Sequence, residues 1–194
     1  IVENRGGAGG NIGASAVAKS DPDGRNLLFT PQSPITIAHL LEPKPDFDGA
    51  ADFAPVAIVA KTPLVLLLNA SVPANSLAEL AALSRAKPDS LFYGSPSPEF
   101  AFTTELLARE AGLSMTGVAY RGSAPALTDL LGGQIQVLIA SGAQAKAYLK
   151  QGRVKALVLV GASRSPDFPG VPTTEELQLH NFKAFGWFGL FAPA

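Results

Sequence analysis

Short apolar runs alternate along the chain with segments that have the apolar spacing of amphipathic helices. The runs 135–140 and 154–160 are almost continuously hydrophobic, which is typical of strands buried on both faces of a sheet. Between them Ala143–Lys150 has a helical pattern, and Gly152 marks its end. This alternation predicts an α/β fold with mostly parallel sheets covered by helices.

The same pattern divides most of the chain into expected elements. Ser76, with Glu79 three residues later, has the capping-box spacing that begins a helix, and Gly112 has the position of a residue that ends one. The expected helices are a small-residue helix that ends near Lys19, then Ile35–Leu41, Leu77–Ala86, Glu99–Ala111, Ser123–Leu131, Ala143–Lys150 and Thr173–Leu177. The expected strands are Ile1–Glu3, Asn26–Thr30, Val56–Ala60, Leu64–Leu68, Leu91–Tyr93, Thr116–Ala119, Ile135–Ala140, Val154–Val160 and Phe185–Phe191.

The alternation breaks once, around Lys61-Thr62-Pro63, where two expected strands lie end to end with no helix between them. A strand that leaves one sheet and enters another produces this pattern. Neither end of the chain has the polar residues expected of a natural terminus, so we expect a fragment without its signal peptide.

The amino-acid composition argues against several classes of function. Hydrophobic residues make up 47% of the 194 residues and charged residues 16%, which favours a folded core over disorder. The net charge of −1 gives no basic face for nucleic acid. The chain has no cysteine, which excludes disulfides, thiol nucleophiles and cysteine metal sites. No apolar segment approaches the roughly 20 residues that cross a bilayer, so no direct membrane insertion is expected.

Polar turns follow several expected strands and open the next helix. Ligands bind at the carboxyl ends of strands in open α/β sheets, and the free N–H groups of a helix N-terminus attract anions. Among these turns, Arg121-Gly122-Ser123 gives the strongest indication of an anion-binding site. Arg121 could pair with a ligand carboxylate or lie on the surface, and each serine could simply cap its helix. The candidate ligand-binding residues are Gly10, Asn11, Gln32, Ser33, Ser95, Ser97, Tyr120, Arg121, Gly122, Ser123 and Ser141.

Other candidate chemistry has little support in the sequence. The stretch 6–13 contains a near G-x-G-x-x-G, but the acidic residue that a dinucleotide site needs about 20 positions later is missing. His39 and His180 have no nearby ligand pattern, so no metal and no cofactor are expected. Glu99 could cap its helix, repel a second carboxylate or accept a ligand amine. No nucleophile has a base and an orienting partner, so the sequence favours a binding protein over an enzyme.

The segments that carry a family resemblance are Glu3–Gly13, Asp52–Val56, Tyr93–Ser95, Tyr120–Gln134, Arg164–Pro166, Gly170–Thr173 and Trp187–Pro193. Taken in order, they resemble the Bug/TctC family, the periplasmic solute-binding proteins of tripartite tricarboxylate transporters. The resemblance covers essentially the whole chain. It departs at Gly6, where the family usually has proline, in the apolar turn 96–102, and at Ala140-Ser141, where the family often has an acidic residue or glycine.

The resemblance implies a type II periplasmic-binding-protein-like fold with two lobes that close on a ligand. It assigns residues 1–62 to a partial lobe one, 63–186 to a complete lobe two and 187–194 to a return strand. It also implies a periplasmic receptor that captures a small carboxylated metabolite between the lobes and delivers it to the permease subunits of the transporter. A ligand-sensing domain that acts through a signalling partner is the alternative. Strand edges left open by a truncated lobe one could make the fragment dimerise.

Overall fold

A computed structural model of the chain describes residues 1–40, 43–88, 90–179, 182 and 186–194. The chain divides into two compact units, a smaller one made of Ile1–Lys61 with Gly186–Ala194 and a larger one made of Thr62–Phe185. Strand β2 (Phe53–Thr62) ends in the sheet of the smaller unit, and β3 (Leu64–Asn69) begins in the sheet of the larger unit. The chain therefore changes sheets at Pro63, as the break in its pattern predicts.

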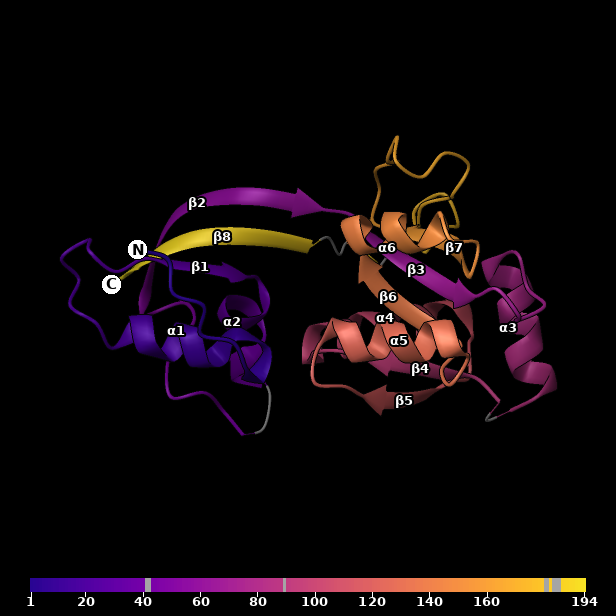
Figure 1. The fold of residues 1–194 in the computed structure, drawn as a ribbon, viewed down its shortest axis with the longest axis horizontal. Coiled ribbons are helices and arrows are strands. Elements are labelled where there is room, and N and C mark those ends of the chain that lie inside the picture. Colours follow the sequence, from indigo (N-terminus) through magenta and orange to yellow (C-terminus); the bar gives the residue numbers. More distant parts are fainter. Residues whose placement is uncertain (41–42, 89, 180–181, 183–185) are drawn as a thin grey trace. The chain divides into compact units, whose positions relative to one another are not determined.

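The larger unit contains a five-stranded sheet with the order β5-β4-β6-β3-β7 (Figure 1). Strand β4 runs parallel to β5 and β6, whereas β3 is antiparallel to both β6 and β7. All strands except β3 therefore point the same way, which confirms the expected α/β class with a mostly parallel sheet. Besides β3, the strands are β4 (Phe92–Ser95), β5 (Thr116–Ala119), β6 (Val137–Ser141) and β7 (Val154–Val160).

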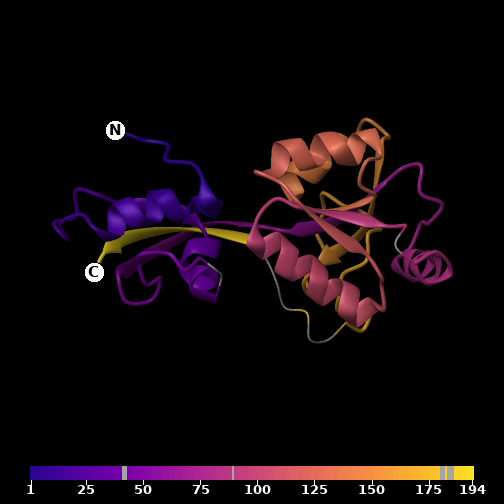
Figure 2. The same cartoon turned by 90° about the horizontal axis from the view of Figure 1, so that it is seen from below.

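Strand β3 forms the centre of the core because every one of its residues is buried. Leu66 and its even-numbered neighbours pack in one cluster with α3 (Leu77–Ala86) and α4 (Pro98–Ala111). Val65 and Leu67 pack in a second cluster with α5 (Ser123–Gly132) and α6 (Gly142–Leu149). Figure 2 shows α4 and α5 on opposite sides of the sheet. Two covered faces explain why the central strands are hydrophobic at every position.

Local signals set the helix ends as predicted. The Ser76 hydroxyl accepts a hydrogen bond from the Glu79 N–H at 3.2 Å, and the Glu79 carboxylate accepts one from the Asn75 N–H at 2.7 Å. Gly112 ends α4 in the left-handed conformation, at φ 64°. The expected helix at 77–86 has the observed bounds, and α4 begins one residue earlier than expected, at Pro98.

The smaller unit has a three-stranded sheet with the order β1-β8-β2, in which β1 is antiparallel to β8. Phe53 of β2 and Phe191 of β8 pack in its core with Ala14 and Leu28. The elements of this unit are the 3₁₀ turn η1 (Ala8–Gly10), α1 (Asn11–Ala18), β1 (Leu28–Pro31), α2 (Ser33–Thr36), the 3₁₀ turn η2 (Ala38–Leu40), β2 and β8 (Gly186–Pro193).

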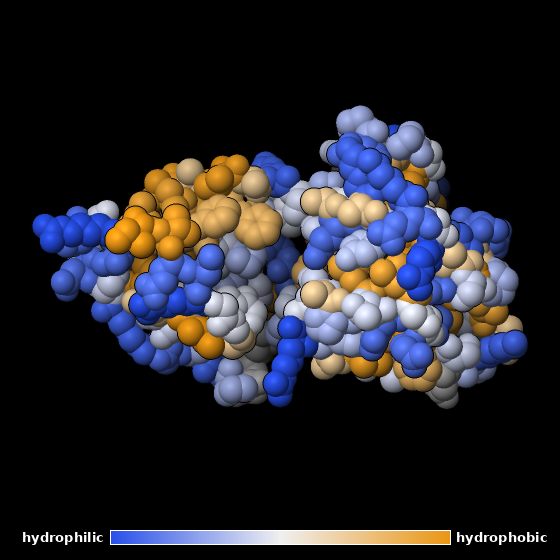
Figure 3. All heavy atoms as spheres, viewed as in Figure 1, coloured by the Kyte–Doolittle hydropathy of each residue, from blue (hydrophilic) through white to orange (hydrophobic). Residues whose placement is uncertain are grey.

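Strand β2 leaves most of its apolar side chains uncovered. Val56, Ile58 and Val59 are each 57% exposed, and β2 lies at the edge of the sheet formed by the described strands. Apolar atoms accordingly gather over β2 and β8 in Figure 3. A long apolar edge strand is a site at which another strand can pair.

Three expected elements differ from the structure by more than their bounds. Ile1–Glu3 is fully exposed and forms no strand, because no neighbouring strand pairs with it among the described residues. The expected helix from Ile35 is divided into α2 and η2, and its last residue, Leu41, lies outside the described residues.

The expected helix Thr173–Leu177 is a turn. Thr173 and Glu176 exchange hydrogen bonds at 2.9 and 3.1 Å in the manner of a capping box. Gln178, however, has a φ of 61°, which ends the helical path after a single turn. Phe185, the first residue of the expected last strand, and His180 lie outside the described residues.

Candidate functional site

Three polar turns lie at one edge of the larger sheet. Strands β4, β5 and β6 run in parallel, so their carboxyl ends, at Ser95, Ala119 and Ser141, share that edge. The Tyr120 N–H donates to the Ser95 carbonyl at 2.9 Å, which joins the first two turns directly. This is the edge at which open α/β sheets bind their ligands.

The N-terminus of α5 is open to an anion. Its N-cap is Gly122, which has no side chain to accept a hydrogen bond from the first helical N–H groups. The first two residues of the helix, Ser123 and Ala124, have N–H groups, whereas Pro125 has none. A ten-residue helix with such a start offers N–H donors and the positive end of its dipole to a carboxylate.

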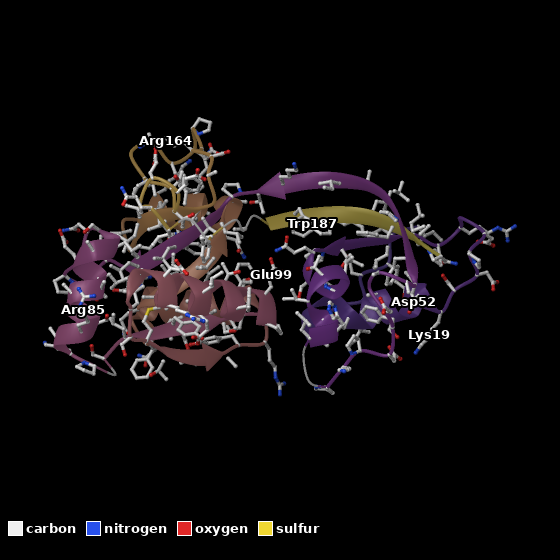
Figure 4. The ribbon with its side chains drawn as sticks, turned by 180° about the vertical axis from the view of Figure 1, so that it is seen from behind. Lys19, Asp52, Arg85, Glu99, Arg164 and Trp187 are labelled. Atoms are coloured by element: carbon white, nitrogen blue, oxygen red, sulfur yellow. The ribbon has the colours of Figure 1, made fainter. Side chains whose placement is uncertain are left out.

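The N-terminus of α4 is similar. Its N-cap, Ser97, makes no side-chain capping bond, and the Ser95 hydroxyl instead donates to the Ser97 carbonyl at 3.2 Å. Glu99 lies in the first turn of α4 and is only 8% exposed (Figure 4). The side-chain carboxyl of Glu99 thus lies at the end of α4 that a ligand carboxylate would otherwise approach, which distinguishes this turn from the start of α5.

The third turn differs because α6 caps itself. The Ser141 hydroxyl accepts from the Gln144 N–H, and the Gln144 side-chain oxygen accepts from the Ser141 N–H, at 3.5 and 3.4 Å. The Gly142 N–H donates to the Pro63 carbonyl at 2.8 Å. Ser141 therefore has the capping role that was the alternative for each serine, and its place among the ligand contacts stays a prediction.

Tyr120 has a fixed hydroxyl. It donates to the Asp129 carboxylate at 2.7 Å, a partner that is not among the residues predicted from the sequence. Burial, followed by the hydrogen bond and the charge of Asp129, raises the pKa of Tyr120 to about 12. The only sequence signal for the pair is a carboxylate inside α5, nine residues after the tyrosine. Arg121, by contrast, is exposed, so its guanidinium can turn toward an anion.

The raised pKa predicts a loss of stability in alkali. A tyrosine whose folded pKa lies above its usual 10.0 contributes fully below about pH 10, and the contribution disappears as the pH rises toward about 12. Urea unfolding at pH 9 and pH 11 should show a smaller loss in Tyr120→Phe than in the unaltered chain. An equal loss in both proteins would contradict this assignment.

Gly122 allows the backbone conformation of the turn. Its φ of 109° and ψ of 174° lie in a region that is essentially restricted to glycine, and no atom lies within 4 Å of a Cβ built there. Gly122→Ala should cost about 1–3 kcal/mol of local strain and change the turn without any steric clash. Gly132, at the other end of α5, also has open space around a Cβ and does not have a positive φ.

Isothermal titration of each variant with a carboxylate ligand should therefore show weaker binding for Gly122→Ala and unchanged binding for Gly132→Ala. Equal affinities in the two variants would show that the conformation of Gly122 does not matter for binding.

The smaller unit brings its own predicted residues together. Gly10, at φ 100°, precedes the first residue of α1, Asn11. A Cβ at Gly10 would lie 3.1 Å from the Pro34 ring, so the turn before α1 lies against the start of α2. Gln32 is the N-cap of α2 and its N–H donates to the Trp187 carbonyl at 3.2 Å, whereas Ser33 is only 5% exposed. Gly10 and Asn11 are thus neighbours of the turn at Gln32.

The described residues contain no group of three or more His, Asp or Glu side chains that could hold a metal ion. His39 lies in η2, and the pKa of the nearby Asp48 carboxylate is lowered mainly by hydrogen bonds from the Ala50 and Ala51 N–H groups. None of the helices among the described residues combines the length and the apolar character needed to cross a membrane.

Comparison with known proteins identifies the family. The profile of the tripartite tricarboxylate transporter family receptor, TctC, matches residues 1–194. This chain belongs to that family. Protein BugT of Bordetella pertussis is 35% identical over 196 residues, which cover 100% of this chain and 60% of BugT. Members of this TctC family are receptors, which confirms the expectation of a binding protein rather than an enzyme.

Solved structures of family relatives have the same fold. A structure described as R. palustris Rpa4515 with adipate is 33% identical, with a TM-score of 0.91 over 100% of this chain and 65% of that chain. MatC from Rhodopseudomonas palustris with bound malate is 34% identical, with a TM-score of 0.84 over 96% of this chain and 64% of MatC. A structure described as a periplasmic transporter has a TM-score of 0.90 at 30% identity, which confirms the expected fold class.

This TctC-family chain is shorter than its relatives. It spans 60%, 58% and 52% of the lengths of three curated proteins that it matches.

Proposed function

We propose that this chain is part of a periplasmic solute receptor that binds a small carboxylated metabolite and delivers it to a tripartite tricarboxylate-type permease. The match of the TctC receptor profile to all of residues 1–194 carries the proposal. The N-terminus of α5 supplies the chemistry, because it offers N–H donors without a side-chain cap or an acidic residue in its first turn, at the ligand-binding edge of the sheet. The relatives described with adipate and malate have ligands of this class.

A thermal-shift series tests the proposal. Malate, adipate and other dicarboxylates at millimolar concentration should raise the unfolding temperature, because a ligand that binds only the folded state stabilises it. The matched controls are the corresponding diamides, which keep the shape and lose the charge. The proposal fails if no carboxylate raises the unfolding temperature or if the diamides raise it equally.

Within this proposal, most of the candidate residues have a role. The N–H groups around Ser97 and Ser123 bind the carboxylate, and Arg121 pairs with it through its fork of donors. Residues 1–62 and 187–194 belong to lobe one, and residues 63–186 form lobe two. Gly10, Asn11, Gln32 and Ser33 are the contribution of lobe one to ligand binding.

The exposed edge of β2 leads to a separate proposal, that the 194-residue chain self-associates. Val56 and Ile58 are uncovered on an edge strand of the described sheet, which favours strand pairing between copies. Light scattering after size exclusion should show a dimer whose fraction grows with concentration. The variant Ile58→Lys should shift it to monomer, since a charge on an edge strand opposes pairing. A chain that stays monomeric at all concentrations would contradict this proposal.

A further inference from the structure

Tyr120 is fixed at both of its ends. Its backbone N–H donates to the Ser95 carbonyl at 2.9 Å, and its hydroxyl donates to the Asp129 carboxylate at 2.7 Å. Asp129 belongs to α5, nine residues further along the chain, so this second bond spans the turn Arg121-Gly122-Ser123. The strand before the turn and the helix after it are thereby joined by one side chain.

The turn itself has few other supports. Arg121, Ala124 and Pro125 are exposed, and Gly122 has open space on the side where a Cβ would lie. The backbone conformation of Gly122 is one that glycine can readily leave. The direction of the α5 N–H groups therefore depends on contacts that hold both ends of the turn.

Asp129 is well placed to receive this contact. Its carbonyl accepts the Gln134 N–H at 2.9 Å where α5 ends, so the residue is held in the helix by its backbone while its carboxylate reaches back to Tyr120. The Tyr120 hydroxyl is protonated, and therefore a donor, throughout the neutral range, as a tyrosine with the ordinary pKa of about 10 also is. A hydrogen bond to an ionised acceptor is among the stronger ones in proteins.

We propose that Tyr120 is a positioning residue, which orients the Arg121–Ser123 turn through its hydrogen bond to Asp129 and does not itself donate to the ligand. This proposal rests on the proposed carboxylate site, and it changes the role of Tyr120 from a ligand contact to a support. It also makes Asp129 necessary for binding, although its carboxylate would repel a carboxylate ligand that it touched.

A matched control exists in the same unit. Tyr93 is 4% exposed and its hydroxyl donates to the Glu105 carboxylate, so it forms a second tyrosine–carboxylate pair. That pair joins β4 to α4 and does not span the turn before α5. Tyr93→Phe therefore removes the same kind of hydrogen bond from the fold and leaves the Arg121–Ser123 turn intact.

Titration calorimetry with malate and adipate tests the proposal. Tyr120→Phe and Asp129→Ala should each weaken binding about tenfold, the scale of one lost hydrogen bond to a charged group. The double variant should bind no more weakly than either single variant, because both remove the same contact. Asp129→Asn keeps an acceptor oxygen and should restore most of the affinity, and Tyr93→Phe should leave the affinity unchanged.

Additive losses in the double variant would overturn the proposal, as would an equal loss of affinity in Tyr93→Phe. Hydrogen exchange of the residue 120 amide gives a readout without ligand, and it should accelerate about tenfold in Tyr120→Phe and not in Tyr93→Phe. If neither malate nor adipate binds the unaltered protein, the proposed function fails and the exchange rates alone decide whether Tyr120 holds the turn.

Discussion

Leu66→Ala is expected to lower the free energy of unfolding of the larger unit by about 2–5 kcal/mol. Leu66 is 0% exposed, and its strand β3 is hydrogen-bonded on both sides, with Leu66 opposite Ile139 of β6 and Val158 of β7. The side chain packs with residues of α3 and α4, so its removal leaves a cavity that the flanking strands cannot fill by moving. The loss is a large share of the stability of a domain of this size.

The matched control is Val59→Ala in β2, because Val59 is 57% exposed and its truncation creates no cavity. Urea unfolding followed by circular dichroism should show a large shift in midpoint for Leu66→Ala and a change within about 0.5 kcal/mol for Val59→Ala. Similar shifts in the two variants would mean that β3 is not the central strand of the core.

Ser95→Glu is expected to weaken the binding of a carboxylate ligand by about 100-fold. Ser95 ends β4, beside the uncapped N-terminus of α4, and its carbonyl is joined to Tyr120 at the neighbouring turn. The glutamate carboxylate would interact with the positive end of the helix dipole in place of the ligand, and it would repel the negative charge of the ligand.

Ser95→Gln is the control for this variant, since glutamine has the size of glutamate without its charge. Calorimetry with malate or adipate should show most of the loss in Ser95→Glu alone, at similar unfolding temperatures for the two proteins. An equal loss in both variants would assign the effect to bulk, and unchanged binding in both would remove Ser95 from the site.

The sequence predicts the structure best where a local rule determines it. The expected helix Leu77–Ala86 and the expected strands Thr116–Ala119 and Val154–Val160 have the observed bounds. Each is delimited by a cap, a glycine or a change in hydrophobic period, which are properties of neighbouring residues. Turns at strand ends could be predicted for the same reason, because a serine or glycine between a strand and a helix is visible in the sequence.

The predictions that failed concern features that depend on the three-dimensional arrangement of the chain or on the conformation of a single residue. Ile1–Glu3 has the composition of a strand, but a strand exists only where a neighbour pairs with it. Thr173–Leu177 begins like a helix, yet the left-handed Gln178 ends the helical path. The contact between Tyr120 and Asp129 depends on how β5 and α5 are arranged in space, which no spacing rule specifies. The capping of α6 by Ser141 is not among these failed predictions, because capping is the alternative interpretation of that serine and Ser-x-x-Gln has the spacing of a capping box.

The place of Gly117 beside Tyr93 has a consequence for how the sequence can vary. A Cβ at Gly117 would lie 2.7 Å from the Tyr93 hydroxyl oxygen and 2.8 Å from the ring carbon that carries it. The two residues are paired across β4 and β5, so neither can move away without breaking the sheet register. A larger residue at 117 thus requires a shorter one at 93, which would leave Glu105 without its donor. Positions 93, 105 and 117 are therefore expected to change together in evolution, as a single inherited unit.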